Sequence, residues 1–589
     1  MPNAVPKVVM SNRLLSAVVG LLVLLGCPAR STPQSRTSAD STTLRDVRAA
    51  IAAKPAQQDT LPRDSVADLP RATVDVRSVP STGQIIRVEA SGNLQSALDR
   101  AKPGDVIRLA SGATYVGNFT LPSKSCGAAP IVLRSDVADS VLPPEGQRLT
   151  PALAPRLAKI ATRNERPALK TTNPTCGWRL LGLEVTVTPE LAPTTVNYGL
   201  VLLGDGGWVK GGDTQTTAAN VPSRIILDRV YVHGLPTTNL VRCVALNSAR
   251  SAVINSWISD CHAKGFDSQA IEGWNGPGPY LIENNFLAGA GENVMFGGAD
   301  PGIAGLSPSD ITIRRNHVWK DPAWKGRWTV KNLFELKNAR RVLVEQNVFE
   351  NNWADGQSGM AIVIKSSQDA CGTCTWQGTT DVTFRYNIVR NSPRGFNAQA
   401  VDCSGQACVD VHVSRVRVEN NLFHNIGTFN GTGSDGWLVL LTHDLRDVTI
   451  RHNTFSGNLP NGGTAIVMDY GEGRARNLHI TDNVFTSPVG YGIFYSGTKV
   501  GTESLRAMAG SSWTFVRNVV GGVEPQFSSW HPPQNWYPPK VALIAFLDPV
   551  GGDYRLSAKS EFKQHGQGGT DPGADLNGLR KLIDGVVVR

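Results

Sequence analysis

The sequence predicts an all-β fold, a right-handed parallel β-helix of roughly ten or more stacked coils with an N-terminal capping helix. Three observations between Ile225 and Asn518 lead to this prediction. A short motif recurs along the segment, an asparagine recurs at one position of the motif, and charges of opposite sign alternate beside that asparagine.

The motif reads apolar, any, apolar, any, any, asparagine, any, apolar. Apolar residues two apart are typical of a strand, and asparagine suits a bend because its amide bonds nearby backbone and it tolerates left-handed dihedrals. The repeated residue is Asn285, Asn316, Asn347, Asn387, Asn421, Asn453 and Asn483, with looser copies at Asp228, Asn255 and Asn518. Units of this size stack, so equivalent strands pair at ~4.8 Å and the asparagines form a hydrogen-bonded column.

The residue two before each asparagine alternates in sign. The series is Glu283, Arg314, Glu345, Arg385, Glu419 and Arg451. In-register stacking sets each carboxylate against a guanidinium, worth roughly 0.2–1 kcal/mol per pair. A helical solenoid would need apolar residues three and four apart, and a β-propeller would need ~40 residues per blade with antiparallel hairpins; both fit the pattern less well.

The first 27 residues are predicted to be a signal peptide. Lys7 and Arg13 precede an apolar run from Leu14 to Leu25 that is short for a membrane span. The run ends Leu24-Leu25-Gly26-Cys27, which resembles a bacterial lipobox, and this implies lipidation of Cys27. An ordinary cleaved signal and a retained anchor are the alternatives, and all three imply export. Residues 28–83, rich in Ser, Thr and Pro, are predicted to be a disordered tether.

The β-helix is predicted to span residues 84–560, followed by a C-terminal cap or tail over residues 561–589, of which residues 571–589 would cover the last coil. Leu94, Ala97, Leu98 and Ala101 have helical spacing and predict the capping helix. With Leu94-Gln95-Ser96-Ala97-Leu98 followed by Pro103-Gly104-Asp105, the chain resembles the pectate-lyase-like β-helix superfamily. The resemblance covers residues 84 to 560 and implies the fold more strongly than the reaction.

Eight cysteines remain if Cys27 is lipidated, an even number that favours disulfides in an exported chain. The expected partners are Cys126 with Cys176 and Cys243 with Cys261. Two further pairs, Cys371 with Cys374 and Cys403 with Cys408, lie in insertions of adjacent coils and could pair within or across them. Zinc binding by these four is the alternative.

One face of the solenoid carries the candidate catalytic residues. The strands before the motif align so that Lys337 and Lys365 become neighbours on adjacent coils, with Glu335 beside Lys337 and Glu272 on an earlier coil. Two adjacent ammonium groups repel, which would lower one pKa and make Lys337 a general base, while Lys365 binds a substrate carboxylate. In the resembled superfamily, lyases use a Lys or Arg base for β-elimination, often with calcium. The alternative is that both lysines belong to another salt-bridge ladder.

Further residues are predicted to bind substrate. Trp274, Trp324, Trp328 and Trp353 lie in bends, where exposed indole faces would suit sugar rings, although each could instead pack over its bend. His443 is a weaker candidate.

Acidic side chains suggest two other chemistries. Glu272, Glu292 and Asp300 could bind Ca²⁺. Glu272 with Glu335, or Asp402 with Asp469, could form the carboxylate pair of a glycoside hydrolase.

The formal charge of +9 suits an acidic partner. We therefore expect an exported protein that binds acidic polysaccharide and cleaves it by β-elimination. It would be a lipoprotein of the outer membrane or cell surface, or a secreted protein. We expect a monomer that contacts membrane only through its lipid anchor, and no nucleic-acid partner, since no dense Lys/Arg stripe is present. The rivals are a noncatalytic adhesin or sugar-binding protein, whose charged groups would all be paired, and a glycoside hydrolase.

Overall fold

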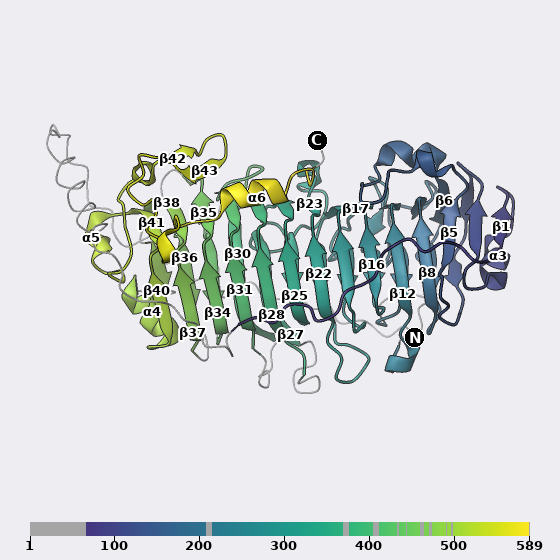
Figure 1. Cartoon of the computed structure of the whole chain (residues 1–589), viewed down its shortest axis with the longest axis horizontal. Coiled ribbons are helices and arrows are strands. Elements are labelled where there is room, and N and C mark those ends of the chain that lie inside the picture. The colour runs from purple at the N-terminus through teal and green to yellow at the C-terminus, as the bar shows by residue number, and fades with distance from the viewer. Residues whose placement is uncertain are drawn as a thin grey trace.

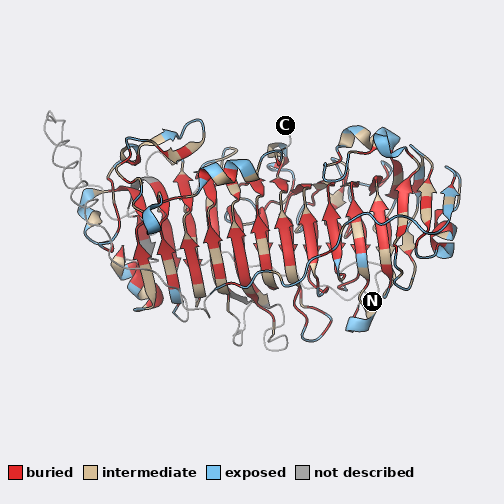
Figure 2. Cartoon of the chain, viewed as in Figure 1, coloured by how far each residue is buried: buried red, intermediate tan, exposed pale blue. Residues whose placement is uncertain are grey.

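The computed structural model describes residues 66–207, 215–368, 376–403, 412–432, 435–442, 444–459, 464–469, 474–490, 492–495 and 499–587. Three long parallel sheets, here called A, B and C, run along one elongated body (Figure 1). Most of the strand residues are buried (Figure 2). The predicted fold of stacked β-coils is confirmed.

Sheet A pairs its strands in the order β1 (Ile85–Val88), β2 (Val106–Leu109), β5 (Ile131–Ser135), β8 (Cys176–Leu181), β12 (Ser223–Asp228), β16 (Ser251–Ile254), β19 (Tyr280–Glu283), β22 (Ser309–Arg314), β25 (Ala339–Glu345), β28 (Thr379–Arg385), β31 (Ser414–Glu419), β34 (Arg446–Arg451), β37 (Arg476–Thr481) and β40 (Trp513–Val516).

Sheet B contains β3 (Thr114–Val116), β6 (Ala158–Thr162), β9 (Leu183–Val187), β13 (Tyr231–His233), β17 (Trp257–Cys261), β20 (Phe286–Gly289), β23 (His317–Trp319), β26 (Val348–Glu350), β29 (Ile388–Ser392), β32 (Leu422–Ile426), β35 (Thr454–Gly457), β38 (Val484–Gly490) and β41 (Val519–Val523).

Sheet C contains β4 (Phe119–Leu121), β7 (Leu169–Thr171), β11 (Val201–Leu203), β15 (Arg242–Leu246), β18 (Gln269–Gly273), β21 (Glu292–Phe296), β24 (Phe334–Leu336), β27 (Met360–Gln368), β30 (Arg394–Cys403), β33 (Val439–Thr442), β36 (Ile466–Asp469) and β39 (Ile493–Tyr495).

Short elements complete the described chain. Two small sheets pair β10 (Val196–Asn197) with β14 (Asn239–Leu240) and β42 (Phe546–Asp548) with β43 (Asp553–Leu556). The α-helices are α3 (Leu94–Arg100), α4 (Thr502–Ala509), α5 (Pro525–Ser528) and α6 (Leu576–Leu582). The 3-10 helices are η2 (Asp139–Val141), η3 (Pro151–Arg156), η4 (Ala218–Asn220), η5 (Pro322–Trp324), η6 (Val541–Ile544) and η7 (Gln567–Gly569).

The asparagine column is confirmed. The Nδ2 of Asn316 donates to Oδ1 of Asn347 at 3.0 Å, and Asn347 donates in the same way to Asn387. The column runs on through Asn421, Asn453, Asn483 and Asn518 to Asn535, which lies beyond the motif. Each side chain therefore ties its coil to the next one.

The alternating charges beside the asparagines pair as predicted. Arg314 and Glu283 are 2.8 Å apart, and Arg385 and Glu345 are also 2.8 Å apart. A second alternating column on sheet A was not predicted. It contains Asp310, Arg341, Asp381, Arg415 and Asp447, all with left-handed backbone near φ +52° to +59°.

The N-terminal end is capped as predicted. Helix α3 starts at the N-cap Asn93, whose side chain accepts a hydrogen bond from the backbone nitrogen of Ser96 at 2.9 Å. Leu94, Ala97 and Leu98 are buried in the main core. The apolar spacing therefore identified both the helix and the face that closes the first coil.

Residues 571–587 do not cover the last coil, so that prediction is wrong for the described part of the segment, although Phe562, earlier in the tail, packs with Val484 and Val519 of the last two coils. Helix α6 lies along the middle coils instead (Figure 1), where Arg315 donates to the carbonyl oxygen of Leu582 at 2.6 Å. Leu576 and Leu579 pack against Leu422 there. Helix α4 contacts the late strands β36, β37 and β39.

Residues 66–83, predicted to belong to the disordered tether, lie across the outer face of sheet A; we call this segment the strap (Figure 1). Its backbone amides at Asp68 and Arg71 donate to Asp381 and Asp310 at 3.1 and 2.8 Å. Val74 is buried in a small apolar cluster on the sheet. Composition alone missed these contacts, because backbone amides that donate to side chains leave no signal in it.

Two predicted disulfides are present, Cys126–Cys176 and Cys243–Cys261. The pairing of the other four cysteines stays a prediction. Cys371, Cys374 and Cys408 lie outside the described residues, as does Cys27, and only the backbone of Cys403 is described. Within the described residues, no helix is long and apolar enough to cross a membrane.

Candidate functional site

The candidate site lies on the outer face of sheet C, where neighbouring coils bring distant side chains together. Glu272 on β18 pairs with Met295 on β21, and Met295 pairs with Glu335 on β24. Leu336 pairs with Ile364, so the following residues, Lys337 and Lys365, are neighbours on adjacent coils. The predicted alignment of these strands is confirmed.

The two lysines share one carboxylate. Lys365 Nζ lies 3.0 Å from Oε1 of Glu335, and Lys337 Nζ lies 3.9 Å from the same oxygen. Asn332 donates to the other oxygen of Glu335 at 2.8 Å. Glu335 is fully buried, whereas the side chains of Lys337 and Lys365 are 14% and 10% exposed. The ammonium groups therefore lie above a buried counterion.

These ion pairs overturn the prediction that Lys337 is a general base. Burial disfavours its charged form, but Glu335, Glu292, Asp267 and Glu272 outweigh burial and raise its pKa above the ordinary value. Burial also opposes the ionisation of Glu335, yet Lys337 and Lys365 prevail and lower its pKa to about 2. Lys337 is held as a cation, because the repulsion between two lysines is weaker than their attraction to nearby carboxylates.

More charged groups adjoin this trio. Arg242 forms an ion pair with Glu272, and Lys331 lies 2.5 Å from Asp267 and 3.7 Å from Glu292. Together with Glu335, Lys337 and Lys365, these residues form what we call the charged cluster. It contains four acidic and four basic side chains, each within ion-pairing distance of an opposite charge.

The outer face of sheet C is less open than predicted. Glu272 and Met295 point away from the core but are buried. The segment after β21 packs over them: a Cβ on Gly298 would lie 2.8 Å from the Met295 side chain. Gly297 has φ +89°, and a Cβ there would lie 3.0 Å from that of Lys337. The cluster therefore reaches solvent through Asp267, whose side chain is 40% exposed, and less through its four basic side chains.

The predicted calcium ligands are not arranged as a metal site. Glu272 binds Arg242, Glu292 binds Gln269 and Lys331, and Asp300 accepts a hydrogen bond from Gln377. No group of three His, Cys, Asp or Glu suited to a metal ion occurs in the part of the chain that the structure describes. The three residues therefore do not fit a shared Ca²⁺.

The carboxylate pair predicted for a glycoside hydrolase, Glu272 with Glu335, is also occupied by ion pairs. Glu272 and Glu335 lie two coils apart in one column, which corresponds to ~9.6 Å of strand spacing. Both are fully buried and ion-paired. The side chain of Asp402 lies outside the described residues, so its pairing with Asp469 stays a prediction.

The predicted sugar-binding tryptophans are buried, so the expectation of exposed indole faces is wrong. Trp274 and Trp353 have no exposed surface, and Trp324 and Trp328 are 5% and 9% exposed. The last three pack in one apolar cluster, where His262 stacks on Trp328 with ring centroids 4.0 Å apart. The rings of Trp324, Trp328 and Trp353 therefore pack against each other and against neighbouring apolar side chains, and offer no flat face to a sugar. His443 lies outside the described residues.

Sequence reasoning missed four residues at this site. Arg242, Asp267 and Lys331 precede or begin strands, outside the aligned motif, so periodicity did not point to them. Phe266, beside Asp267, is a large exposed aromatic residue that packs edge-on against Tyr198 with ring centroids 6.1 Å apart. An exposed ring next to charged groups suits a sugar ring.

Glu292 predicts a pH effect. Burial and the Asp267 carboxylate raise its pKa from 4.5 to about 7, although Lys331 opposes the shift. The folded protein thus holds this proton more tightly than the unfolded chain, so stability is lost as pH rises from about 4.5 to about 7. Glu292→Gln should remove this loss and gain on the order of 2 kcal/mol relative to wild type between pH 5 and pH 8.

Urea unfolding of both proteins at pH 5 and pH 8 would measure this difference. The exposed Glu145→Gln serves as the matched control, and its stability relative to wild type should not change with pH. A Glu292→Gln effect that is the same at both pH values would contradict the assignment of the raised pKa to Glu292.

Comparison with known proteins agrees with the architecture. A family model described as a right-handed β-helix region matches residues 244–504. The parallel strand pairing and this match together show that the chain is a right-handed parallel β-helix. No curated protein matches the sequence significantly.

Solved structures with a similar fold include polysaccharide lyases. An alginate lyase from Paenibacillus sp. str. FPU-7 shares 16% identity over 70% of this chain and 98% of its own, with a TM-score of 0.32. A mannuronic acid specific family 6 lyase from human gut microbiota shares 11% over 85% and 99%, with a TM-score of 0.41. Pectate lyase Pel9A shares 12% over 84% and 96%, with a TM-score of 0.34. At these identities and TM-scores, the likeness says nothing about what this chain does.

Proposed function

We propose that this chain is an exported carbohydrate-active protein that binds acidic polysaccharide over the charged cluster of sheet C. One observation carries the proposal: Lys337 and Lys365 lie on adjacent coils and share the single buried carboxylate of Glu335. Both ammonium groups are partly exposed, whereas the carboxylate between them is fully buried. A uronate carboxylate would accept charge-assisted hydrogen bonds from the two ammonium groups.

Neighbouring features support the same ligand. Arg242 and Lys331 add two further basic groups on neighbouring coils, each partly exposed and paired with a carboxylate. Phe266 offers an aromatic ring beside them. Because coils repeat at ~4.8 Å, a polymer that crosses them meets more than one of these groups. The two disulfides are typical of exported proteins, and a lipid anchor at Cys27 is part of the proposal.

Binding has more support than cleavage. Beta-elimination requires a group that accepts the proton next to the uronate carboxylate, and Lys337 is held protonated. The mutual pairing of the cluster's acidic and basic groups is the arrangement expected of a noncatalytic binding protein. Lyase activity therefore stays a prediction, and it would need a base other than Lys337. Cleavage can be measured on the same polymers as binding.

Lys365→Gln and Lys337→Gln should each weaken binding to polygalacturonate or alginate by about 10-fold, since a charge-assisted hydrogen bond contributes roughly 1.5–3 kcal/mol. Binding should decrease with added salt, and a neutral glucan should not bind. Calorimetry would measure the affinities, and absorbance of unsaturated uronates would report cleavage.

The exposed Lys559→Gln is a matched control, because it removes the same charge away from the cluster. Its affinity should equal that of wild type. The proposal fails if neither acidic polymer binds, or if both cluster variants bind as well as the control.

A further inference from the structure

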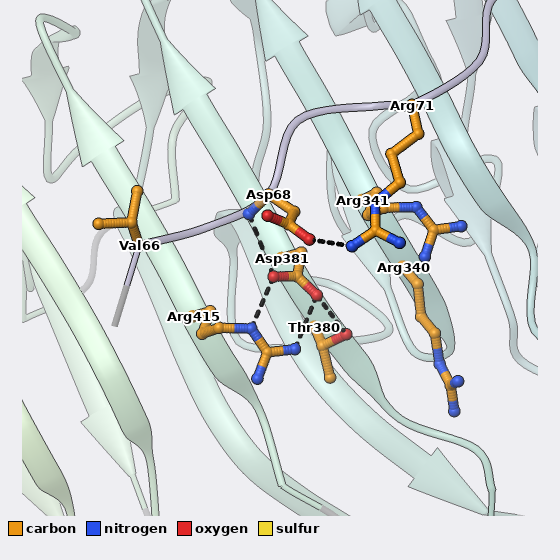
Figure 3. A pocket seen from close by; sticks show the side chains of 8 residues that line it. All are labelled: Val66, Asp68, Arg71, Arg340, Arg341, Thr380, Asp381 and Arg415. Atoms are coloured by element: carbon orange, nitrogen blue, oxygen red, sulfur yellow. Dashed lines mark hydrogen bonds and ion pairs between the residues drawn. The ribbon is translucent and has the colours of Figure 1, made fainter. Parts of the chain in front are cut away.

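A second charged site lies on sheet A, beneath the strap. Here a pocket of about 530 Å³ is lined by four arginines, Arg71, Arg340, Arg341 and Arg415, together with Asp68 and Asp381 (Figure 3). Arg71 and Asp68 come from the strap, and the others come from β25, β28 and β31. The pocket therefore exists only where the strap meets the sheet.

Two of the arginines are held rigidly by aspartates of the unpredicted left-handed column. Arg415 donates through Nε and Nη2 to Asp381 at 2.6 and 2.7 Å. Arg341 donates through the same two groups to Asp310 at 2.7 and 3.0 Å. Within the described residues, the Nη1 group of neither side chain donates a hydrogen bond. Each planar guanidinium is thus oriented while part of it stays available to a ligand.

The strap also contributes to the pocket, and its one carboxylate there, that of Asp68, is paired within the strap. Its Asp68 forms an ion pair with Arg71 at 2.5 Å, and the Asp68 backbone amide donates to Asp381. Both aspartates of the pocket therefore already have guanidinium partners, so neither presents an uncompensated negative charge to a ligand.

Arg340 leaves the positive charge in excess. Its Nη2 donates to the carbonyl oxygen of Trp376 at 2.5 Å, and its Nε is buried with no hydrogen-bond partner among the described residues. The four arginines of the pocket outnumber the three carboxylates near them, which belong to Asp68, Asp310 and Asp381. Burial and the nearby Arg341 and Arg415 guanidiniums lower the pKa of Arg340, as expected where an anion would be favourable.

We propose that this pocket binds an oxyanion, either a free inorganic anion such as phosphate or the carboxylate of a sugar acid. Guanidinium groups match the paired oxygens of such ligands and bind them by charge-assisted hydrogen bonds. The ligand would contact arginines from the strap and from two coils at once, and would hold the strap on the sheet. The site is separate from the charged cluster of sheet C and does not depend on the function proposed there.

The test is a calorimetric titration of the full chain with inorganic phosphate and, separately, with glucuronate. Wild type should bind at least one of them saturably, and Arg340→Gln should weaken binding about 10-fold. Arg71→Gln should act in the same direction with little risk to folding, because Arg71 is exposed. Binding of phosphate alone would identify an inorganic ligand. Binding of glucuronate that Arg340→Gln and Arg71→Gln weaken would identify a sugar carboxylate in this pocket, whereas glucuronate binding that only Lys365→Gln weakens would belong to the charged cluster of sheet C.

Arg476→Gln is the matched control, because the strand register places Arg476 in the same column of sheet A as Arg340, on β37 and outside the pocket. It should bind phosphate and glucuronate like wild type. Saturating ligand should also slow tryptic cleavage after Arg71 in wild type. The proposal is overturned if neither anion binds saturably, if Arg340→Gln and Arg71→Gln both bind like wild type, or if Arg476→Gln loses as much affinity as they do.

Discussion

Replacing Asn347 with leucine is expected to destabilise the protein by about 3–5 kcal/mol, since several buried polar partners would lose their hydrogen bonds at once. The Asn347 side chain accepts from the backbone and Nδ2 of Asn316 at 2.9 and 3.0 Å. It donates to the carbonyl oxygens of Ile313 and Glu345, and to Asn387. Leucine has a similar volume but cannot replace any of these bonds.

Urea unfolding followed by circular dichroism would measure the loss for Asn347→Leu. Asn577→Ala, on the exposed side of α6, is the control and should change stability by less than about 0.5 kcal/mol. A loss below about 1 kcal/mol for Asn347→Leu would mean that the column contributes little to the stacking of coils.

The asparagine column could be predicted from sequence because one local requirement repeats in every coil. A bend after a strand needs a residue that satisfies its own backbone, and asparagine at a regular interval is visible without knowing the contacts. The second column, with Asp310, Arg341 and Asp381, could not be predicted in this way. Its residues share left-handed backbone, but arginine is not a residue that usually indicates such a conformation.

For the candidate site, the sequence predicted which residues are neighbours, but it did not predict their burial or their pKa shifts. Counting coils correctly placed Lys337 beside Lys365, because the register depends on the periodic motif. The prediction of a lowered Lys337 pKa was wrong, because it gave no weight to the attraction of Glu335 and did not bring Glu292 and Asp267 close to Lys337. The burial of Glu272 was also missed, because the segment that covers it after β21 has no periodic pattern.

The tryptophans show the same limit. Trp324 and Trp328 lie in an irregular segment around η5, and only the folded structure shows that they pack with Trp353 from the next coil. A Gly- and Pro-rich sequence around a tryptophan indicates a bend, but it does not say whether the ring turns inward. The strap was missed for a related reason, since backbone amides donating to Asp381 and Asp310 leave no signal in composition.

Replacing Glu335 with glutamine is also expected to cost about 3–5 kcal/mol at pH 7, because it leaves Lys337 and Lys365 without their shared counterion in a largely buried site. The size of the loss should depend on pH. The folded pKa of Glu335 is about 2, below its ordinary value of 4.5. Its charge therefore stabilises the fold fully above about pH 4.5, and this contribution is lost as pH falls toward 2.

Chemical unfolding of Glu335→Gln and wild type between pH 7 and pH 3 would show the two stabilities converge as the pH falls, opposite in sense to the Glu292→Gln effect. Glutamine keeps the size of the side chain and an oxygen for Asn332, so the change isolates the charge. Adding Lys365→Met to Glu335→Gln should recover part of the loss, because it removes one uncompensated cation. A pH-independent loss, or a double variant no more stable than Glu335→Gln alone, would show that Glu335 acts through packing and not as the counterion of the two lysines.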